Sequence, residues 1–475
     1  MKQRILTLAI AAGLMAGALP CHAEPSLDRP VITLPDFGDP ASSAMSNTEE
    51  THLGLKLLRE LRGSDPIVED PELNEWLQAL GKRLAAHAPG GKNYYFLIAK
   101  NPDINAYAMP GGVVVIHSGL IINTTSESEL AAVIAHEIAH VSQRHIARMM
   151  ADEKGSPWLM GLGVLAGAAA ATKNPDAGEA IMTGTIAAQA HQQLAFSRDA
   201  EFEADRIGLQ ILAGSSFDPG AMPSFLEKLD RRAGNQLYGD INKYLQTHPL
   251  SIERVSDARS RANKLGSGRA QEDVDYLYAR EKLRALTAPS SSAQTDGNSA
   301  VAQYAQAIRL LRSGNGAAAL QKLNAGSGQL PILLASAEAM ISARRYDDAE
   351  KLLMPLARSH PGHEGILNAL ADALLANGKA AQAWQLLSQQ RLDEQSSLEF
   401  LETRQRVAEQ AGQAAEAYTA AAERSLRMGE YKYARASLDQ ATRLPGTSAY
   451  TMARLQAMSQ DIRRMESTAK KLDKF

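Results

Sequence analysis

The chain has 475 residues, of which 45% are hydrophobic and 22% are charged. This length predicts two or three domains, and the composition excludes a single small module, wholesale disorder and a polytopic membrane protein. With 50 basic and 53 acidic residues, the chain has no global positive field that would capture nucleic acid. Its single cysteine excludes a disulfide framework and a cysteine-rich metal site.

The first 23 residues have the pattern of a secretory signal peptide. A short basic start precedes an apolar run over residues 5–19, which is shorter than the ~18–20 residues needed to cross a bilayer. We therefore favour cleavage after Ala23 over a membrane anchor. A lipoprotein acylated at Cys21 is the weaker alternative, because Pro20 directly before it fits that cleavage site poorly. Cleavage after Ala23 leaves a mature protein without thiols, which suits an oxidising compartment.

An N-terminal arm and two helices are expected next. Residues 24–50 are rich in Pro, Asp and Ser and predict an extended arm. Apolar residues at three- and four-residue spacing then predict amphipathic helices over 51–62 and 71–87. Asp70 is the expected cap of the second helix.

A small sheet follows these helices. Two β-rich runs at 94–99 and 113–116 are separated by NAYAMPGG at 105–112, which predicts strands joined by a glycine-containing turn. An exposed edge at 113–116 would pair with an extended substrate chain, and a buried central strand is the alternative.

A long helix from Ser126 to about residue 150 carries the first chemical motif. Its start has the spacing of a capping box, and it contains HEIAH at 136–140. Because His136 and His140 lie one turn apart on one helix face, both can reach a single zinc ion. Glu137 projects beside them as the expected general base for hydrolysis.

A second helix, over about 192–212, carries EFEAD at 201–205. Glu201 would complete a site of two histidines and one glutamate that keeps one position open, as catalytic zinc sites do. Asp205, one turn later, would accept the N–H of a ligand histidine and fix its tautomer. Glu203 points elsewhere on this helix and is expected to be solvated or structural.

Residues 247–254 supply two further candidates, His248 and Arg254. Either is a possible partner for the negative charge that develops on a peptide carbonyl during hydrolysis. His248 has two other interpretations: a fourth zinc ligand that makes the enzyme latent, or part of a segment that only caps a helix. His145, nine residues after His136, is expected outside the set of metal ligands.

The middle of the chain closes the first domain. Residues 158–193 are rich in Gly, Ala and Met, and predict either a packed small-residue helix or a mobile lid or surface for lipid or unfolded substrate. Helical patterns continue to residue 286, and a Ser/Pro/Gly-containing break over 287–300 predicts a linker. These boundaries give a zinc metalloprotease domain over 51–286.

Residues 301–475 repeat one helix–turn–helix unit. A small or turn residue stands five positions before an alanine in each unit, in the pairs Gly314 and Ala319, Arg344 and Ala349, Gly378 and Ala383, Gly412 and Ala417, and Gly429 and Ala434. The spacing matches a 34-residue period and its half, so the segment resembles a degenerate array of tetratricopeptide repeats. A generic helical bundle is the alternative. Stacked helix pairs would present a surface for a peptide or partner protein.

Together, HEIAH, EFEAD, NAYAMPGG and the THP…R segment resemble the HtpX-like gluzincin metallopeptidases. The resemblance implies an α+β zincin-type protease domain followed by an all-α repeat solenoid, mainly α overall. It implies one Zn²⁺ per chain, with His136, His140, Glu201 and, as an open alternative, His248 as ligands. It also gives Glu137 the role of general base and Asp205 a functional role that is sometimes described as proton donation.

With a signal peptide and a repeat tail, the chain resembles periplasmic members of this family in Gram-negative bacteria. That resemblance implies a zinc endopeptidase, with chaperone activity, that promotes outer-membrane β-barrel assembly and degrades misfolded or stalled barrel proteins. Its expected partners are unfolded or misassembled outer-membrane proteins and the β-barrel assembly machinery, with no nucleic acid and with peripheral membrane contact left open. The competing hypothesis is a chaperone or scaffold whose zinc site is mostly latent.

Overall fold

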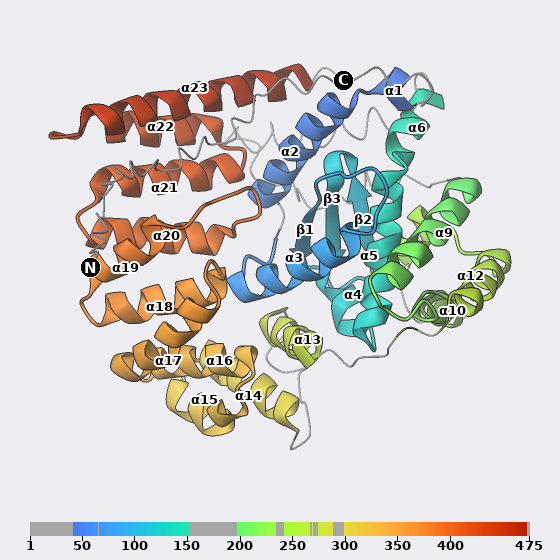
Figure 1. Cartoon of the computed structure of the whole chain (residues 1–475), viewed down its shortest axis with the longest axis horizontal. Helices are drawn as coiled ribbons and strands as arrows, with labels where there is room; N and C mark the ends of the chain where they lie inside the picture. Colours follow the sequence, from blue (N-terminus) through green and yellow to red (C-terminus); the bar gives the residue numbers. More distant parts are fainter. Residues whose placement is uncertain are drawn as a thin grey trace, which may run out of the picture. The chain divides into compact units, whose positions relative to one another are not determined.

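The computed structural model describes residues 41–64, 66–152, 197–233, 242–266, 268, 274–287 and 299–472 (Figure 1). The expected signal peptide, most of the expected arm, the segment 158–193 and linker residues 288–298 lie outside these ranges. The described residues form mainly helices and one small sheet, which confirms the predicted fold class. None of the described helices has the length and apolar content needed to span a membrane.

Helix begins earlier than the sequence pattern predicted. α1 spans Ala41–Ala44 and α2 spans Asn47–Ser64, so the end of the expected arm is helical. The reason is a capping box that apolar spacing does not reveal: the Glu49 N–H donates to Ser46 Oγ, and the Ser46 N–H donates to the Glu49 carboxylate.

The next helix, α3, spans Pro71–Ala85 and begins as predicted. The Asp70 side chain accepts a hydrogen bond from the Leu73 N–H at 2.9 Å. Pro71 stands at the first helical position, where its missing N–H costs no hydrogen bond.

The sheet contains one strand that the sequence did not predict. β1 spans Tyr95–Ala99 and β3 spans Val113–His117, and these two strands are parallel. β2, Ala106–Met109, runs antiparallel to β3 within the segment that was expected to be a turn, and the 3-10 turn η1, Pro110–Gly112, joins the two. The order β1-β3-β2 makes β3 the central, fully buried strand, so the edge-strand interpretation of residues 113–116 is wrong.

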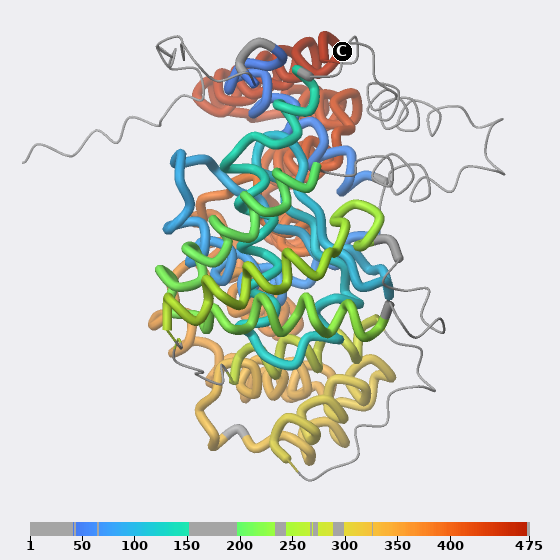
Figure 2. The backbone as a smooth tube through the Cα atoms, turned by 90° about the vertical axis from the view of Figure 1, so that its right-hand side faces the viewer, coloured from blue at the N-terminus to red at the C-terminus, as the bar shows by residue number. Residues whose placement is uncertain are grey.

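Helices cover this sheet. The predicted helix from Ser126 is interrupted, with α5 over Glu127–Ser142 and α6 over His145–Asp152, because Arg144 adopts a left-handed φ of 54°. α5 packs on β2, β3 and α3, and α9 lies beside α5 in both views (Figures 1 and 2). The remaining helices of this part are α4 (Ser118–Asn123), α9 (Arg198–Gly214), α10 (Ala221–Ala233), α11 (Asn242–Thr247), α12 (Ile252–Leu265) and α13 (Val274–Thr287).

The C-terminal part consists of helix pairs that pack in chain order (Figure 1). All five turn residues singled out in the sequence have positive φ, between 60° at Arg344 and 74° at Gly314, and end a helix. The five paired alanines are all buried. The helices are α14 (Ala300–Arg312), α15 (Gly316–Lys322), α16 (Leu330–Ser342), α17 (Tyr346–Ser359), α18 (Glu364–Ala376), α19 (Ala380–Ser388), α20 (Leu398–Gln410), α21 (Ala414–Arg427), α22 (Tyr431–Thr442) and α23 (Ala449–Leu472), with a 3-10 turn at Ala325–Ser327.

The loop between α19 and α20 contacts α2 and α3. The Glu394 carboxylate pairs with the Arg59 guanidinium at 2.5 Å. The Gln395 carbonyl accepts a hydrogen bond from the Asn74 side chain at 2.8 Å. The Leu398 N–H donates to the Glu69 carboxylate at 2.7 Å, so polar groups from both sides pair across this contact.

Candidate metal centre

Helix α5 presents His136, Glu137 and His140 inside the molecule. The Ser126 side chain caps the helix by accepting from the Glu129 N–H, which sets its first turn. His136, Glu137 and His140 are 3%, 0% and 1% exposed. Two histidines and a glutamate that are this deeply buried need polar or metal partners, because burial without them is costly.

Helix α9 brings Glu201 and Asp205 against the two histidines. A glycine allows the close approach of α9 to α5: a Cβ atom on Gly208 would lie 3.3 Å from the His136 backbone nitrogen. Glu201 is 0% exposed, and Asp205 is 2% exposed. The two carboxylates are one turn apart on the same helix face, so both meet α5.

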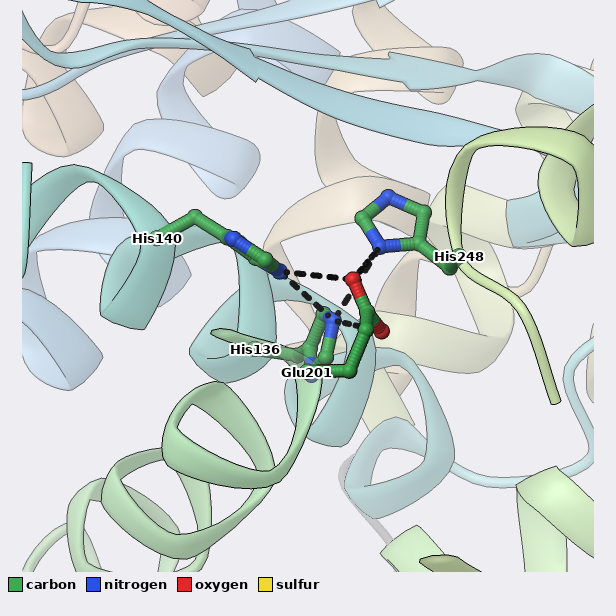
Figure 3. Close-up of side chains that lie close together, drawn as sticks. All are labelled: His136, His140, Glu201 and His248. Carbon is green, nitrogen blue, oxygen red and sulfur yellow. Dashed lines mark hydrogen bonds and ion pairs between the residues drawn. The ribbon is translucent and has the colours of Figure 1, made fainter. Parts of the chain in front are cut away.

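His248 reaches the same place from the segment that joins α11 to α12. Its backbone N–H donates to the Tyr244 carbonyl at 2.8 Å, and its ring packs against the Tyr244 ring in a tilted arrangement, with 4.7 Å between the ring centroids. Ser251 caps α12 by accepting from the Arg254 N–H, so His248 is not the cap of that helix. The imidazole is 1% exposed and points into the cluster (Figure 3).

The ligand atoms of His136, His140, Glu201 and His248 all lie within 4.8 Å of one another (Figure 3). The nitrogen–nitrogen distances are 3.0 Å between the Nε2 atoms of His136 and His140, and 3.3 Å between His136 Nε2 and His248 Nδ1. Glu201 Oε1 lies 3.4 Å from His140 Nε2 and 3.0 Å from His248 Nδ1.

These separations fit a tetrahedral zinc site. With metal–ligand bonds of about 2.0–2.1 Å, the edges of a tetrahedron are about 3.3 Å long, close to the four distances above. Imidazole nitrogens with one carboxylate oxygen are also a donor set that zinc accepts. The residues present can therefore hold a zinc ion.

Asp205 and Arg254 surround this cluster. Asp205 Oδ1 lies 3.0 Å from His136 Nδ1, the ring nitrogen that faces away from the other ligands. The Arg254 guanidinium donates to both oxygens of Asp205, at 2.8 and 2.9 Å, and lies 2.6 Å from the Glu201 carboxylate. Arg254 also donates to the Pro249 carbonyl at 2.9 Å, which fixes the chain directly after His248.

Burial and charge shift the pKa values in opposite directions within this cluster. Burial lowers the pKa of His136, but Asp205 and Glu201 more than compensate and raise it to about 10. Burial holds the pKa of His140 well below its usual value. Burial by itself raises the pKa of Glu201, but the nearby histidines hold that pKa well below its usual value. The carboxylates thus create a negative site that favours a cation.

Glu137 differs from Glu201 in its surroundings. Burial raises the pKa of Glu137, with His248 and His136 opposing the shift. A hydrogen bond from the Ala108 backbone also opposes the shift, and His248 Nε2 lies 3.5 Å from Glu137 Oε1. A buried carboxylate that lies beside the ligands and whose pKa is raised can accept a proton from a molecule that enters the site.

Two residues that sequence reasoning placed away from the site also touch it. His145 lies outside the group of possible metal ligands, but its Nδ1 is 2.9 Å from His140 Nδ1. Glu203 is partly exposed, and its carboxylate accepts from His145 Nε2 at 3.1 Å. Neither contact follows from helical spacing, since both depend on the break at Arg144.

Comparison with known proteins agrees with this geometry. Residues 71–262 match the model of peptidase family M48. The chain is 37% identical over 385 residues to the β-barrel assembly-enhancing protease of Escherichia coli (strain K12). This match covers 81% of this chain and 74% of the relative. The chain is 36% identical over 353 residues to the protein of that name in Yersinia pestis, covering 74% and 68%. It is 31% identical over 240 residues to the mitochondrial metalloendopeptidase OMA1 of Arabidopsis thaliana, covering 50% and 43%. The chain therefore belongs to the β-barrel assembly-enhancing protease family of M48 peptidases, and it is a zinc metalloendopeptidase.

Proposed function

We propose that His136, His140 and Glu201 hold the zinc ion and that Glu137 is the general base for peptide-bond hydrolysis. The observation that carries this assignment is the buried cluster of ligand atoms within 4.8 Å of one another, next to the buried Glu137 carboxylate. Zinc supplies a Lewis acid that polarises a carbonyl and makes water more acidic. Glu137 takes a proton from water and then delivers it to the leaving amine.

Asp205 orients His136 in this proposal. Its carboxylate, 3.0 Å from His136 Nδ1, fixes the tautomer that directs Nε2 toward the zinc ligands. Arg254 was a candidate for stabilising the developing oxyanion, but its contacts to Asp205, Glu201 and Pro249 support a role in holding these groups. Asp205 as a proton donor is less well supported, since burial raises its pKa but His136 and Arg254 outweigh burial and hold the pKa below its usual value.

For His248 we propose that it occupies the fourth zinc position and keeps the site latent. Its Nδ1 lies as close to Glu201 and His136 as the other ligand atoms do. His248→Ala should then bind zinc and cleave faster or less selectively than the wild type. If His248→Ala keeps zinc and loses activity, His248 stabilises the transition state instead.

We propose that the substrate is an extended polypeptide that adds to strand β2. Among the described residues, β2 pairs with β3 on one side only, and Ala108 of β2 lies beside the Glu137 carboxylate. Main-chain pairing would give affinity with little sequence selectivity, which suits a protease for misfolded chains.

The biological setting is proposed from the relatives named for β-barrel assembly. The chain would be exported through a cleaved signal peptide over residues 1–23 and act in the periplasm of a Gram-negative bacterium. There it would promote assembly of outer-membrane β-barrel proteins and degrade those that are stalled. A protease domain over 51–286 would cut, and tetratricopeptide-type repeats over 301–475 would recruit substrates or the assembly machinery.

The second candidate function is a chaperone or scaffold whose zinc site is mostly latent. The burial of all four ligand side chains favours such a latent site in the resting protein. The variant Glu137→Gln distinguishes the protease from the chaperone or scaffold function. Glu253→Gln, on the exposed face of α12, is the matched control. We expect purified wild type and Glu253→Gln, but not Glu137→Gln, to cleave an unfolded outer-membrane barrel protein. If Glu137→Gln restores outer-membrane assembly in a deletion strain, proteolysis is dispensable for that role. If neither the wild type nor His248→Ala ever cleaves such a substrate, the proposal that the chain degrades barrel proteins is overturned.

A further inference from the structure

The break between α5 and α6 turns His145 back onto His140. In a continuous helix, residues five apart are about 140° apart around the axis, so their side chains would not meet. Here Arg144 takes a left-handed φ of 54°, a conformation that is unfavourable for a non-glycine residue. The Arg144 guanidinium, which is buried, binds the Glu50 carboxylate at 2.9 Å and the Met45 carbonyl, and these contacts hold the break in place.

The reversed chain creates a line of hydrogen bonds that starts at a proposed zinc ligand. His140 Nδ1 lies 2.9 Å from His145 Nδ1, and the two rings meet edge to face at 4.8 Å. On its other side, His145 Nε2 lies 3.1 Å from the Glu203 carboxylate, which Arg148 also contacts at 3.1 Å. His145 is 4% exposed, so water does not compete freely for these contacts.

The line of contacts determines which nitrogen of His140 carries its proton. An ionised Glu203 can only accept, so His145 Nε2 is the donor to it. A neutral His145 then accepts at Nδ1, and the proton between the two imidazoles belongs to His140 Nδ1. His140 Nε2 is left with its lone pair, and this is the atom that lies 3.4 Å from Glu201 Oε1 inside the ligand cluster.

We propose that His145, supported by Glu203, is a positioning residue that sets the tautomer and ring orientation of His140 for zinc. This inference rests on the zinc site proposed above. The two ligand histidines then have different hydrogen-bond partners for their Nδ1 atoms. His136 contacts the Asp205 carboxylate, and His140 contacts the neutral imidazole of His145. The Glu203 support comes from α9, two residues after Glu201, so the same line of contacts also joins the helices that carry the ligands.

The test compares two substitutions of His145 in the purified full chain. His145→Leu removes the acceptor, whereas His145→Asn retains one, because its side-chain oxygen occupies nearly the place of Nδ1. Loss of a group that supports a metal ligand typically costs about 10–100-fold in metal affinity, and we expect His145→Leu to show this loss in chelator competition for zinc. We expect His145→Asn to stay much closer to wild type and Glu203→Ala to lose less than His145→Leu. Gln210→Ala, an exposed change on α9, is the control.

The visible absorption of the cobalt(II)-loaded protein adds a readout of ligand geometry that packing alone would not change. We expect an altered spectrum for His145→Leu and a spectrum like that of wild type for His145→Asn. Equal zinc affinity in His145→Leu and wild type, or equal losses in both His145 variants, would overturn the inference. If wild type binds no zinc, the proposed zinc site is wrong. If wild type binds zinc and His136→Ala abolishes binding, the zinc site is supported, and the His145 variants then test only the inference about His145.

Discussion

Lys282 of α13 provides a buried cation whose removal should have a pH-dependent cost. Its side chain is 5% exposed, and its ammonium lies 2.9 Å from the Asp70 carboxylate and 2.6 Å from that of Glu72. Removing one partner of a buried ion pair typically costs about 3–5 kcal/mol, because the opposite charge stays buried without compensation. Lys282→Met should therefore lower the free energy of unfolding by about that amount at pH 8.

The same change should cost less in acid. Burial raises the pKa of Glu72 to about 7 from its ordinary 4.5, with Lys282 opposing the shift, so this pKa rises further in Lys282→Met. When folding raises the pKa of a carboxyl, the folded state takes up the proton at a higher pH than the unfolded state does. The stability it contributes is thus fully present below pH 4.5 and is lost as the pH rises through the folded-state pKa. The deficit of Lys282→Met should therefore be clearly smaller at pH 5 than at pH 8.

Urea unfolding at both pH values measures the deficit, with Lys264→Met on the exposed face of α12 as the control. Adding Glu72→Gln removes the uncompensated charge, so the double variant should be more stable than Lys282→Met at pH 8. A deficit that is equal at both pH values and that Glu72→Gln does not relieve would refute the electrostatic reasoning and leave only lost packing.

Four further changes test other parts of the structure. Removing the metal with a chelator should lower the thermal unfolding midpoint, since a ligand at a thousandfold excess over Kd stabilises the folded state by about 4 kcal/mol; an unchanged midpoint would contradict coupling of zinc to folding. Gly54→Ala should cost about 1–3 kcal/mol in urea unfolding. The reason is that its Cβ would lie 2.6 Å from the Pro110 carbonyl oxygen and 2.7 Å from Gly111 Cα; a neutral result would mean that α2 shifts freely. Gly378 has a φ of 72°, so Gly378→Ala should destabilise the fold by about 1 kcal/mol. Arg344 has a φ of 60°, so Arg344→Gly should not destabilise it. The opposite order in urea unfolding would argue against backbone strain at these helix ends.

The sequence by itself determined the features that depend on neighbours within one or two turns. Asp70 caps α3 as predicted, and the HEIAH segment lies on a helix that Ser126 caps. The recurring turn residues of the C-terminal part all take positive φ at helix ends, because a helix stop is a local property of the chain. Helical spacing also put His136 beside His140, since side chains four apart share one face.

Only the tertiary structure decided the features that join distant segments. Strand β2 exists because β3 pairs with it, although its own sequence is as compatible with a turn. His248 reaches Glu201 across 47 positions, and Lys282 meets Glu72 across 210. His145 touches His140 because buried contacts of Arg144 with Glu50 and Met45 hold a left-handed residue that local propensity disfavours. Such contacts form when remote groups are buried together, and local sequence does not encode which groups those will be.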